Sequence, residues 1–387
     1  MIEAPQIDLA YSLTDGAIAV NNLESARKYS WSRFWRDPIR PGIAESIVEQ
    51  EHLTAQFVGD IGALDRLDTL IRCLDRVDAT SQRTTLIRAQ IASMEHRFAE
   101  AKRHLDELGD WGELSDAANR LSLSIDQACG TDLEAALEAR RWMASRSGRL
   151  EDLVPLAALH ADLREFDEAD RIYQHALREY RDTSPFAVAW VCFQLGVLWG
   201  ELVRESQSSR AEHWYQSAIE YLPCYVKARV HLSEIYLRHG RAKDAETLLL
   251  AVIPSGDPEV HWRLAEVLVQ MGRLADAEVQ MLIARSGFEA LLEKHLLAFA
   301  DHVAEFYSGS GNDAQRAFEL ASLNLINRPT LRAFEQAYEA AVAAGVSEQS
   351  TQILGAAKKR WGATDAFRLS PLVETHADQP GCEGATA

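Results

Sequence analysis

The sequence has 387 residues, of which 47% are hydrophobic and 25% are charged, enough for an ordinary soluble protein with a large core. It carries 40 Lys and Arg residues against 58 Asp and Glu residues, a formal net charge of −18. An acidic chain repels phosphate backbones, which argues against nucleic acid as a main partner. The charge serves solubility and favours partners with basic surfaces. No apolar run approaches the length that crosses a bilayer, so we expect no membrane partner.

The cysteines and the N-terminus indicate a cytoplasmic protein. The chain has five cysteines, an odd number without any CxxC pair, which is typical of isolated, reduced thiols: Cys73, Cys129, Cys192, Cys224 and Cys382. The first twenty residues begin acidic and lack the basic and apolar regions of a signal peptide. We therefore expect a cytoplasmic location.

Residues 1–45 end in an aromatic and basic stretch, YSWSRFWRDPIRPG (29–42). One interpretation is an N-terminal helical cap whose aromatic rings close the end of the helices that follow. The other is an exposed patch of rings and guanidinium groups that docks a partner: Trp31, Arg33, Trp35 and Arg36. We favour the cap and keep the docking patch as the alternative.

The rest of the chain predicts helices in succession. Ala, Leu, Glu and Arg are abundant, while Val/Ile alternation is scarce. Asp257-Pro258 and Ser184-Pro185 each place a capping residue before a proline at the first helical position. Breaks such as RHGR and QMGR separate helical segments of about a dozen residues, the spacing of helical hairpins.

A short phrase recurs within these hairpins. HGRAKDAE (239–246) returns as MGRLADAE (271–278), and comparable small or apolar residues occur along the chain. These anchor residues are Leu67, Ala101, Ala136, Ala169, Ala211, Ala245, Ala277 and Ala317. Their successive gaps are 34, 35, 33, 42, 34, 32 and 40 residues, with visible insertions in the two long gaps. We expect each phrase to be a joint, in which the glycine turns the chain and the alanine lets two helices approach closely.

The pattern resembles the tetratricopeptide repeat, a helix–turn–helix unit of about 34 residues. Its better copies include LGVLWG…AEHWYQSAIEYLP and LAALHADLREFDEADRIYQHAL. The resemblance implies an all-α, right-handed α-solenoid of antiparallel helix pairs, with about nine units over residues 46–362 that are clearest in 150–290. The family's early tryptophan is replaced by Arg229 and His261. Residues 363–387 are polar and predict a disordered tail.

No catalytic constellation emerges from the sequence. SGSGNDA (308–314) lies between helices instead of following a strand, so it predicts a turn, not a phosphate site. His295 and His302 are seven residues apart on one helical face, but no third metal ligand is evident. We expect no cofactor, no metal and no enzymatic activity.

The resemblance implies that the first helices of successive units line a concave face. The residues placed there are mainly apolar and aromatic, which suits an apolar or aromatic-anchored peptide better than a bound carboxylate. Beside Leu121 and Ile125, the predicted binding residues are Trp190, Phe193, Val197, Trp262, Glu266, Phe299 and Phe306. Packing between neighbouring units, or occupation of the groove by the chain's own ends, are the alternatives.

The leading hypothesis is therefore a non-enzymatic scaffold or adaptor that binds a protein or peptide, in one form as the accessory subunit of an enzyme complex. A second hypothesis is a peptide-sensing receptor that changes its superhelical pitch. The third is an enzyme or metal protein with an unrecognised site on the array.

Overall fold

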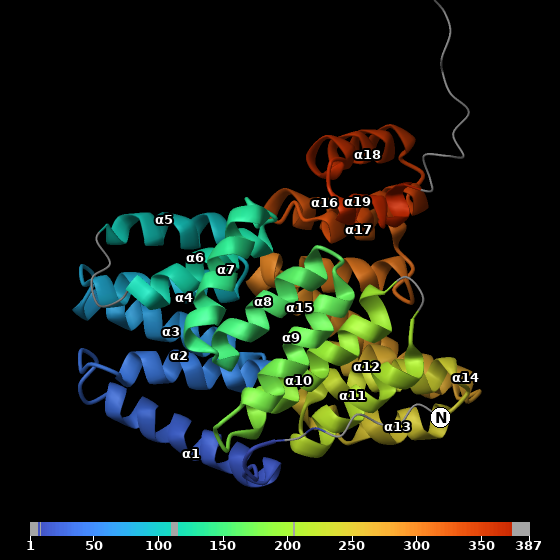
Figure 1. Cartoon of the computed structure of the whole chain (residues 1–387). Helices are drawn as coiled ribbons and strands as arrows, with labels where there is room; N and C mark the ends of the chain where they lie inside the picture. The colour runs from blue at the N-terminus through green and yellow to red at the C-terminus, as the bar shows by residue number, and fades with distance from the viewer. Residues whose placement is uncertain (1–6, 8, 110–114, 204–205, 374–387) are drawn as a thin grey trace, which may run out of the picture.

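Every described element of the computed structural model is a helix (Figure 1). The structure describes residues 7, 9–109, 115–203 and 206–373. Its helices are α1 (Gly16–Phe34), α2 (Ile43–Leu53), α3 (Gly62–Val77), α4 (Gln82–Met94), α5 (Phe98–Leu108), α6 (Ser115–Ala128), α7 (Leu133–Ser147), α8 (Leu150–Asp162), α9 (Phe166–Glu179), α10 (Pro185–Val197), α11 (Ser208–Tyr221), α12 (Val226–Arg238), α13 (Ala242–Leu250), α14 (Pro258–Gln270), α15 (Leu274–Ser308), α16 (Ala314–Asn327), α17 (Leu331–Ala343), α18 (Ser347–Trp361) and α19 (Asp365–Arg368).

Successive helices pair into hairpins, and the predicted anchors occupy one position in them. In seven of the second helices the fourth residue is a buried alanine: Ala101, Ala136, Ala169, Ala211, Ala245, Ala277 and Ala317. A methyl side chain at this place lets the two helices of a pair approach closely. The predicted fold class, an all-α solenoid of antiparallel helix pairs, is confirmed.

The turn follows one rule in five of the seven hairpins that have a buried alanine anchor. Five residues before the anchor the backbone adopts a positive φ, which is 73° at Gly240 and 75° at Gly272. The same place is held by His96 (55°), Arg164 (62°) and Asn312 (48°), none of which is glycine. The repeated phrase is therefore a joint, as predicted, but glycine is only one of the residues that make it.

The charged residues of the phrase also connect one unit to the next. Arg241 bonds Asp244 in its own turn at 2.8 Å and Glu212 of the preceding unit, also at 2.8 Å. Arg273 bonds Asp276 at 2.9 Å and pairs with Glu246, which stands one residue after its anchor just as Glu212 does. These pairs lie at the surface, where each contributes little to the free energy of unfolding, but they recur at equivalent positions in successive units.

The two long gaps between anchors have different structural causes. Before Ala211, α10 runs on into a π-helical turn over Leu198–Leu202. Before Ala317, no loop interrupts the chain: α15 combines the second helix of one unit with the first helix of the next. A kink marks the junction at His295, whose φ of −132° and ψ of 48° are not helical. His295 and His302 therefore do not share one regular helical face, which corrects the expectation from their spacing.

The array curls until late helices touch early ones. The amide of Asn327 donates to the carbonyl of His96 at 2.9 Å, and Lys294 pairs with Asp65 at 2.8 Å. Arg360 of α18 donates to the carbonyl of Gly130 at 2.7 Å. Phe299 packs against both the α1–α4 core and the α14–α17 core. Helices α15–α18 therefore contact α3 and the α4–α5 and α6–α7 turns.

The first helix is anchored in the middle of the chain as well as at its start. α1 packs on α2, and its Ala19 and Leu23 belong to the central core with residues of α8–α14. The amide of Thr14 donates to the carbonyl of Thr183 at 2.8 Å. A Cβ on Gly16 would lie 2.4 Å from the carbonyl of Tyr221, so the start of α1 presses directly on the end of α11. The predicted boundary at residue 45 falls inside α2.

The C-terminal end differs from its prediction. Residues 363–373, expected to be a disordered tail, include α19, and the side chains of Phe367 and Leu372 pack on Trp361. The prediction of disorder relied on the many polar residues in this segment and gave too little weight to its few apolar side chains, which the fold buries. Residues 374–387, the remainder of the predicted tail, lie outside the described part of the chain, as does Cys382.

Residues Pro185–Leu202, which span α10 and its π-helical turn, are long and apolar enough to cross a membrane, contrary to the expectation that no such stretch exists. Two thirds of this segment is buried inside the protein, against α8, α9 and α11. Its apolar character is that of a central core helix, which is weak evidence for any membrane span.

Candidate binding surfaces

The predicted aromatic groove is not an open surface. Trp262, Phe193 and Phe306 are 3%, 6% and 0% exposed, and they belong to two separate cores. Trp262 packs edge-on against Phe306 with ring centroids 5.5 Å apart, and its indole N–H donates to Glu266 at 2.8 Å. Trp190, Val197 and Phe299 are half-buried against the same cores. The prediction that these rings anchor a partner is therefore corrected: they join neighbouring helices.

The same helices present charged residues immediately beside the buried rings. Arg263 follows Trp262 and stacks over its ring at 3.6 Å, and His231 occupies the equivalent place in α12. One step along an α-helix turns the side chain by about 100°, enough to move from the core to the inner side. The prediction therefore chose a buried ring, Trp262, and missed the charged residue that follows it, Arg263, which contacts neighbouring helices.

These residues form an inner charged row across successive first helices. His231 of α12 contacts Glu201 at 2.7 Å, and Arg263 of α14 contacts Glu234 of α12 at 2.7 Å. Arg263 also reaches Glu305 of α15 at 3.1 Å. The inner charged row, defined as Glu201, His231, Glu234, Arg263 and Glu305, therefore connects four consecutive units.

Partial burial and pairing shift the pKa values within this row. Burial alone would raise the pKa of Glu201, but the His231 charge and the hydrogen bonds from His231 and Tyr215 lower it to about 2. Burial would lower the pKa of His231, yet Glu201 raises it to about 9. Burial raises the pKa of Glu234 to about 7 despite the opposing charges of His231 and Arg263.

The aromatic and basic stretch at the end of α1 divides between core and surface. Phe34 is fully buried, and Trp31 is half-buried with its N–H donating to Glu51 at 2.7 Å. Trp35 is exposed and stacks on Trp31, with ring centroids 5.7 Å apart, while Arg33 lies over the ring of Tyr29. Arg36 is exposed beside them. The stretch thus combines packing residues with exposed rings, and its role in docking a partner stays a prediction.

His295 takes part in a structural ion-pair cluster. Its Nδ1 lies 3.2 Å from Glu95 and its Nε2 lies 3.6 Å from Asp65, residues of α3 and the α4–α5 turn. The hydrogen bond with Glu95 raises the pKa of His295. The cluster therefore ties the kink of α15 to the N-terminal units. Among the described residues, no group of three or more His, Cys, Asp or Glu side chains is placed to hold a metal ion.

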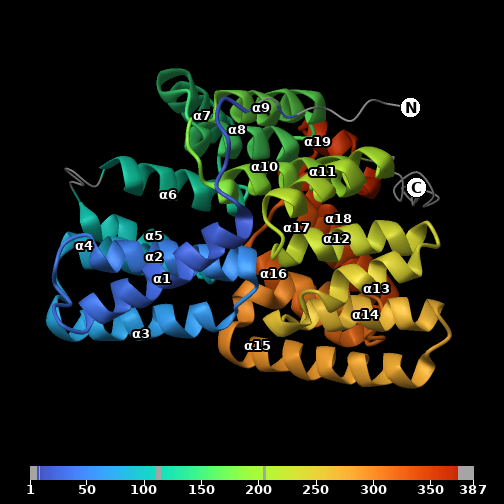
Figure 2. The ribbon, with the colours of Figure 1, turned by 90° about the horizontal axis from the view of Figure 1, so that it is seen from below.

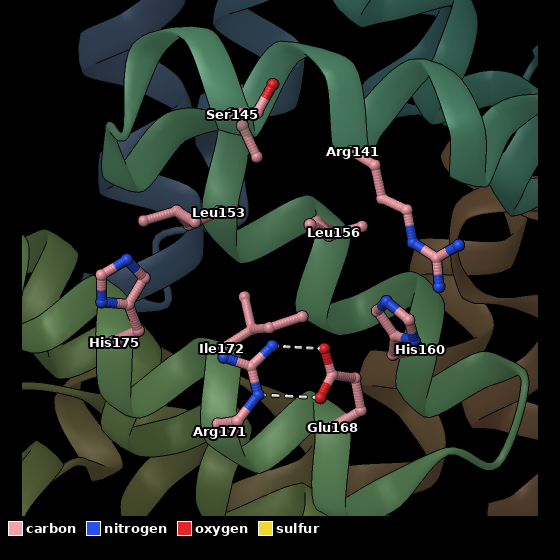
Figure 3. A pocket seen from close by; sticks show the side chains of 10 residues that line it. Arg141, Ser145, Leu153, Leu156, His160, Glu168, Arg171, Ile172 and His175 are labelled. Atoms are coloured by element: carbon pink, nitrogen blue, oxygen red, sulfur yellow. Dashed lines mark hydrogen bonds and ion pairs between the residues drawn. The ribbon is translucent and has the colours of Figure 1, made fainter.

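A hollow of about 270 Å³ opens between α7, α8 and α9, and Figure 3 shows its lining. Its apolar floor is formed by Ala144, Leu153, Leu156 and Ile172. Its polar rim is formed by Arg141, Ser145, His160, Glu168, Arg171 and His175. Glu168 and Arg171 form a paired wall, with one hydrogen bond of 2.8 Å. His160, predicted as a core or groove histidine, is buried, and its Nδ1 pairs with Glu165.

A second hollow, of about 230 Å³, opens between α13, α14 and α15. It is lined by Glu246, Leu250, Leu264, Leu268, Arg273, Asp276, Val279 and Gln280. Leu250 and Val279 are 53% and 56% exposed, and Leu282, farther along α15, is 69% exposed. α15 lies along one edge of the molecule, so its outer side is uncovered (Figure 2).

The two hollows occupy the same place in the repeat. Counted from the anchors, Arg141 corresponds to Leu250, Arg171 to Val279, and His160 to Leu268. Each hollow forms where two neighbouring second helices diverge above the first helix between them. Neither hollow was predicted from the sequence, because the predicted binding residues were placed on the first helices only.

Comparisons with known proteins bear on the fold alone. No family model matches the sequence, and no curated protein matches it. One similar solved structure, the APC/C hetero-tetramer Cut9-Hcn1, has a TM-score of 0.41 and 12% identity over 92% of this chain and 73% of that chain. Another, yeast Tom70, has a TM-score of 0.36 and 13% identity over 92% of this chain and 95% of that chain. At such similarity neither protein informs the function of this one.

The chain's own geometry defines its class. Helical hairpins follow one another, and in seven of them a buried alanine stands at the fourth position of the second helix. In five of these seven a positive-φ residue stands five positions before the alanine. Resemblance to the tetratricopeptide repeat was expected from this spacing. The protein has a tetratricopeptide-like repeat fold.

Proposed function

We propose that the protein is a non-enzymatic interaction scaffold that binds a protein partner on the outer surface of α13 and α15. The observation that carries the proposal is the exposure of Leu250, Val279 and Leu282 around the second hollow. Exposed aliphatic clusters that flank a hollow are typical of protein-binding sites, whereas isolated exposed aliphatics are not. We call this surface, formed by Leu250, Val279, Leu282 and Ile283, the α15 patch.

The shape and charge of the α15 patch favour an amphipathic helix with basic flanks. Val279, Leu282 and Ile283 are spaced three and four residues apart, so they form one apolar stripe along α15. The stretch from Leu274 to Ile283 is about 15 Å long, the length of about three helical turns. Glu278 is exposed beside it and would attract a lysine or arginine next to the partner's apolar face, whereas Asp276 is already paired with Arg273.

Co-purification with matched variants tests the proposal. A V279D/L282D double variant places two carboxylates in the patch. The control variant I326D places a carboxylate at an isolated isoleucine of α16 that is 81% exposed. We expect one set of partners to accompany the native protein and I326D from the native host, and to be lost with V279D/L282D. Circular dichroism should show the same helix content in all three.

Two results would contradict the proposal. One is the recovery of the same partners with V279D/L282D as with the native protein. The other is a homodimer in sedimentation velocity that V279D/L282D converts to monomer, because the patch would then serve self-association.

The proposal retains the accessory-subunit role suggested by the sequence. A scaffold of this kind would bring a partner to a separate enzyme through a second surface. We propose that it acts in the cytoplasm, which is supported by the free thiols of the cysteines within the described residues: Cys73, Cys129, Cys192 and Cys224.

A further inference from the structure

The hollow between α7, α8 and α9 combines an apolar floor with a cationic rim. Leu153, Leu156 and Ile172 form the floor. Arg141 extends from α7 over the hollow toward His160 (Figure 3). Because Arg171 is hydrogen-bonded to Glu168, the carboxylate in the wall is already neutralised. The other charged groups of the rim are paired, Arg171 with Glu168 and His160 with Glu165, so the unpaired charge among the described residues is that of Arg141, in a chain whose net charge is −18.

The surface beside the hollow continues the same chemistry. Trp142 is 60% exposed on α7, and the guanidinium of Arg146 lies 4.8 Å from its ring centroid. Ser145 stands between these residues and the hollow, and it is exposed as well. Arginine and tryptophan at a surface favour partner binding, because each contributes a large contact area and Arg also pairs with carboxylates.

The size and the charge of the hollow select its ligand. A volume of about 270 Å³ lies just below the range of drug-sized ligand pockets, so it suits one anchoring side chain. The floor requires that side chain to be apolar. The positive rim requires negative charge beside the anchor, since Arg141 lies at the rim, and Arg146 adds a second positive charge on the neighbouring surface of α7.

We propose that this hollow binds an acidic peptide segment through a single apolar anchor residue. The anchor side chain enters between α7 and α9 and rests on Leu153, Leu156 and Ile172. A carboxylate next to the anchor pairs with Arg141, and a second one farther along the peptide reaches Arg146 beside Trp142. This inference goes beyond the proposed function, because the hollow is separate from the α15 patch and takes a ligand of opposite charge.

Peptide titration tests the inference directly. The probes are fluorescein-labelled pentapeptides, one with leucine between two pairs of glutamates, one with serine in place of the leucine, and one with lysines in place of the glutamates. We expect saturable anisotropy only with the first peptide and a loss of affinity as salt rises. Arg141→Glu should weaken binding by about tenfold or more, because it replaces an attraction by a repulsion.

Two further variants separate the hollow from general electrostatics. Ser145→Trp should fill the exposed mouth of the hollow and abolish the preference for leucine over serine. Arg103→Glu makes the same charge change on an exposed residue of α5 and should leave binding unchanged. Equal binding of the leucine and serine peptides, or equal losses in Arg141→Glu and Arg103→Glu, would overturn the inference. V279D/L282D should bind the peptide normally, so a failure here is distinct from a failure of the α15 patch.

Discussion

The two hollows share one architecture and differ in chemistry. Both form between neighbouring second helices, above a first helix that has a leucine 13 residues before the anchor, Leu156 in one and Leu264 in the other. Yet the rim of one is Arg141 and Arg171, while the corresponding residues of the other are Leu250 and Val279. The repeat thus determines where a hollow forms, and a few exposed positions determine what it attracts.

The largest expected effect is on stability, and it comes from the close helix contact that both hollows have below them. Ala169 and Ala277 are buried anchors at the close approach of the helices below each hollow. Ala169→Leu and Ala277→Leu should each lower the free energy of unfolding by about 1–3 kcal/mol, because the extra carbons overpack the contact. Urea denaturation measures this. An unchanged stability in either variant would break the structural equivalence of the hollows.

The inner charged row offers a test of whether stability and binding are separable. The pKa of Glu234 is raised to about 7 in the folded protein, so the folded state binds more protons than the unfolded state between pH 4.5 and 7. The free energy of unfolding therefore falls as the pH rises through this window. Glu234→Gln removes the buried charge and should raise stability at pH 8 by about 1–2 kcal/mol, with no difference near pH 4.

Denaturation of the native protein and Glu234→Gln at the two pH values measures this prediction. A gain of equal size at pH 4 and pH 8 would contradict it, because at pH 4 the carboxyl is protonated in both states. Binding of the acidic leucine peptide at pH 8 should be the same in both proteins, since Glu234 lines neither hollow.

Exchanging the rim residues tests whether rim charge determines which peptide a hollow binds. Leu250→Arg with Val279→Arg places arginines in the second hollow at the positions that correspond to Arg141 and Arg171. We expect this variant to gain affinity for the acidic leucine peptide by about tenfold over the native second hollow, measured in an Arg141→Glu background. No gain would show that the rim charges alone do not select the ligand.

The sequence predicted the fold well and the binding residues poorly, for one physical reason. Burial of a small residue such as Ala245 imposes a period that can be counted along a single chain. Whether the side chain of Trp262 points into the core or toward a partner depends on its position around the helix, which changes by about 100° per residue. It also depends on the neighbours that cover the ring, including Phe306 from α15. Those neighbours come from the curl of the array, which the period does not reveal.

The turns below the two hollows give the smallest expected effect. The α14–α15 turn has Gly272 at a φ of 75°, and the α8–α9 turn has Arg164 at 62°. Gly272→Ala should cost about 1 kcal/mol, because a Cβ crowds the backbone in this conformation although open space surrounds it.

Arg164→Gly relieves the same strain but removes the ion pair between Arg164 and Glu335 of α17, so its net gain should be smaller than the loss in Gly272→Ala. Asn312→Gly, at the third such turn, serves as the control because no side-chain bond of Asn312 with a described residue is lost. Thermal unfolding ranks the three proteins. If Arg164→Gly gained as much as Asn312→Gly, the contact with Glu335 would contribute nothing to stability.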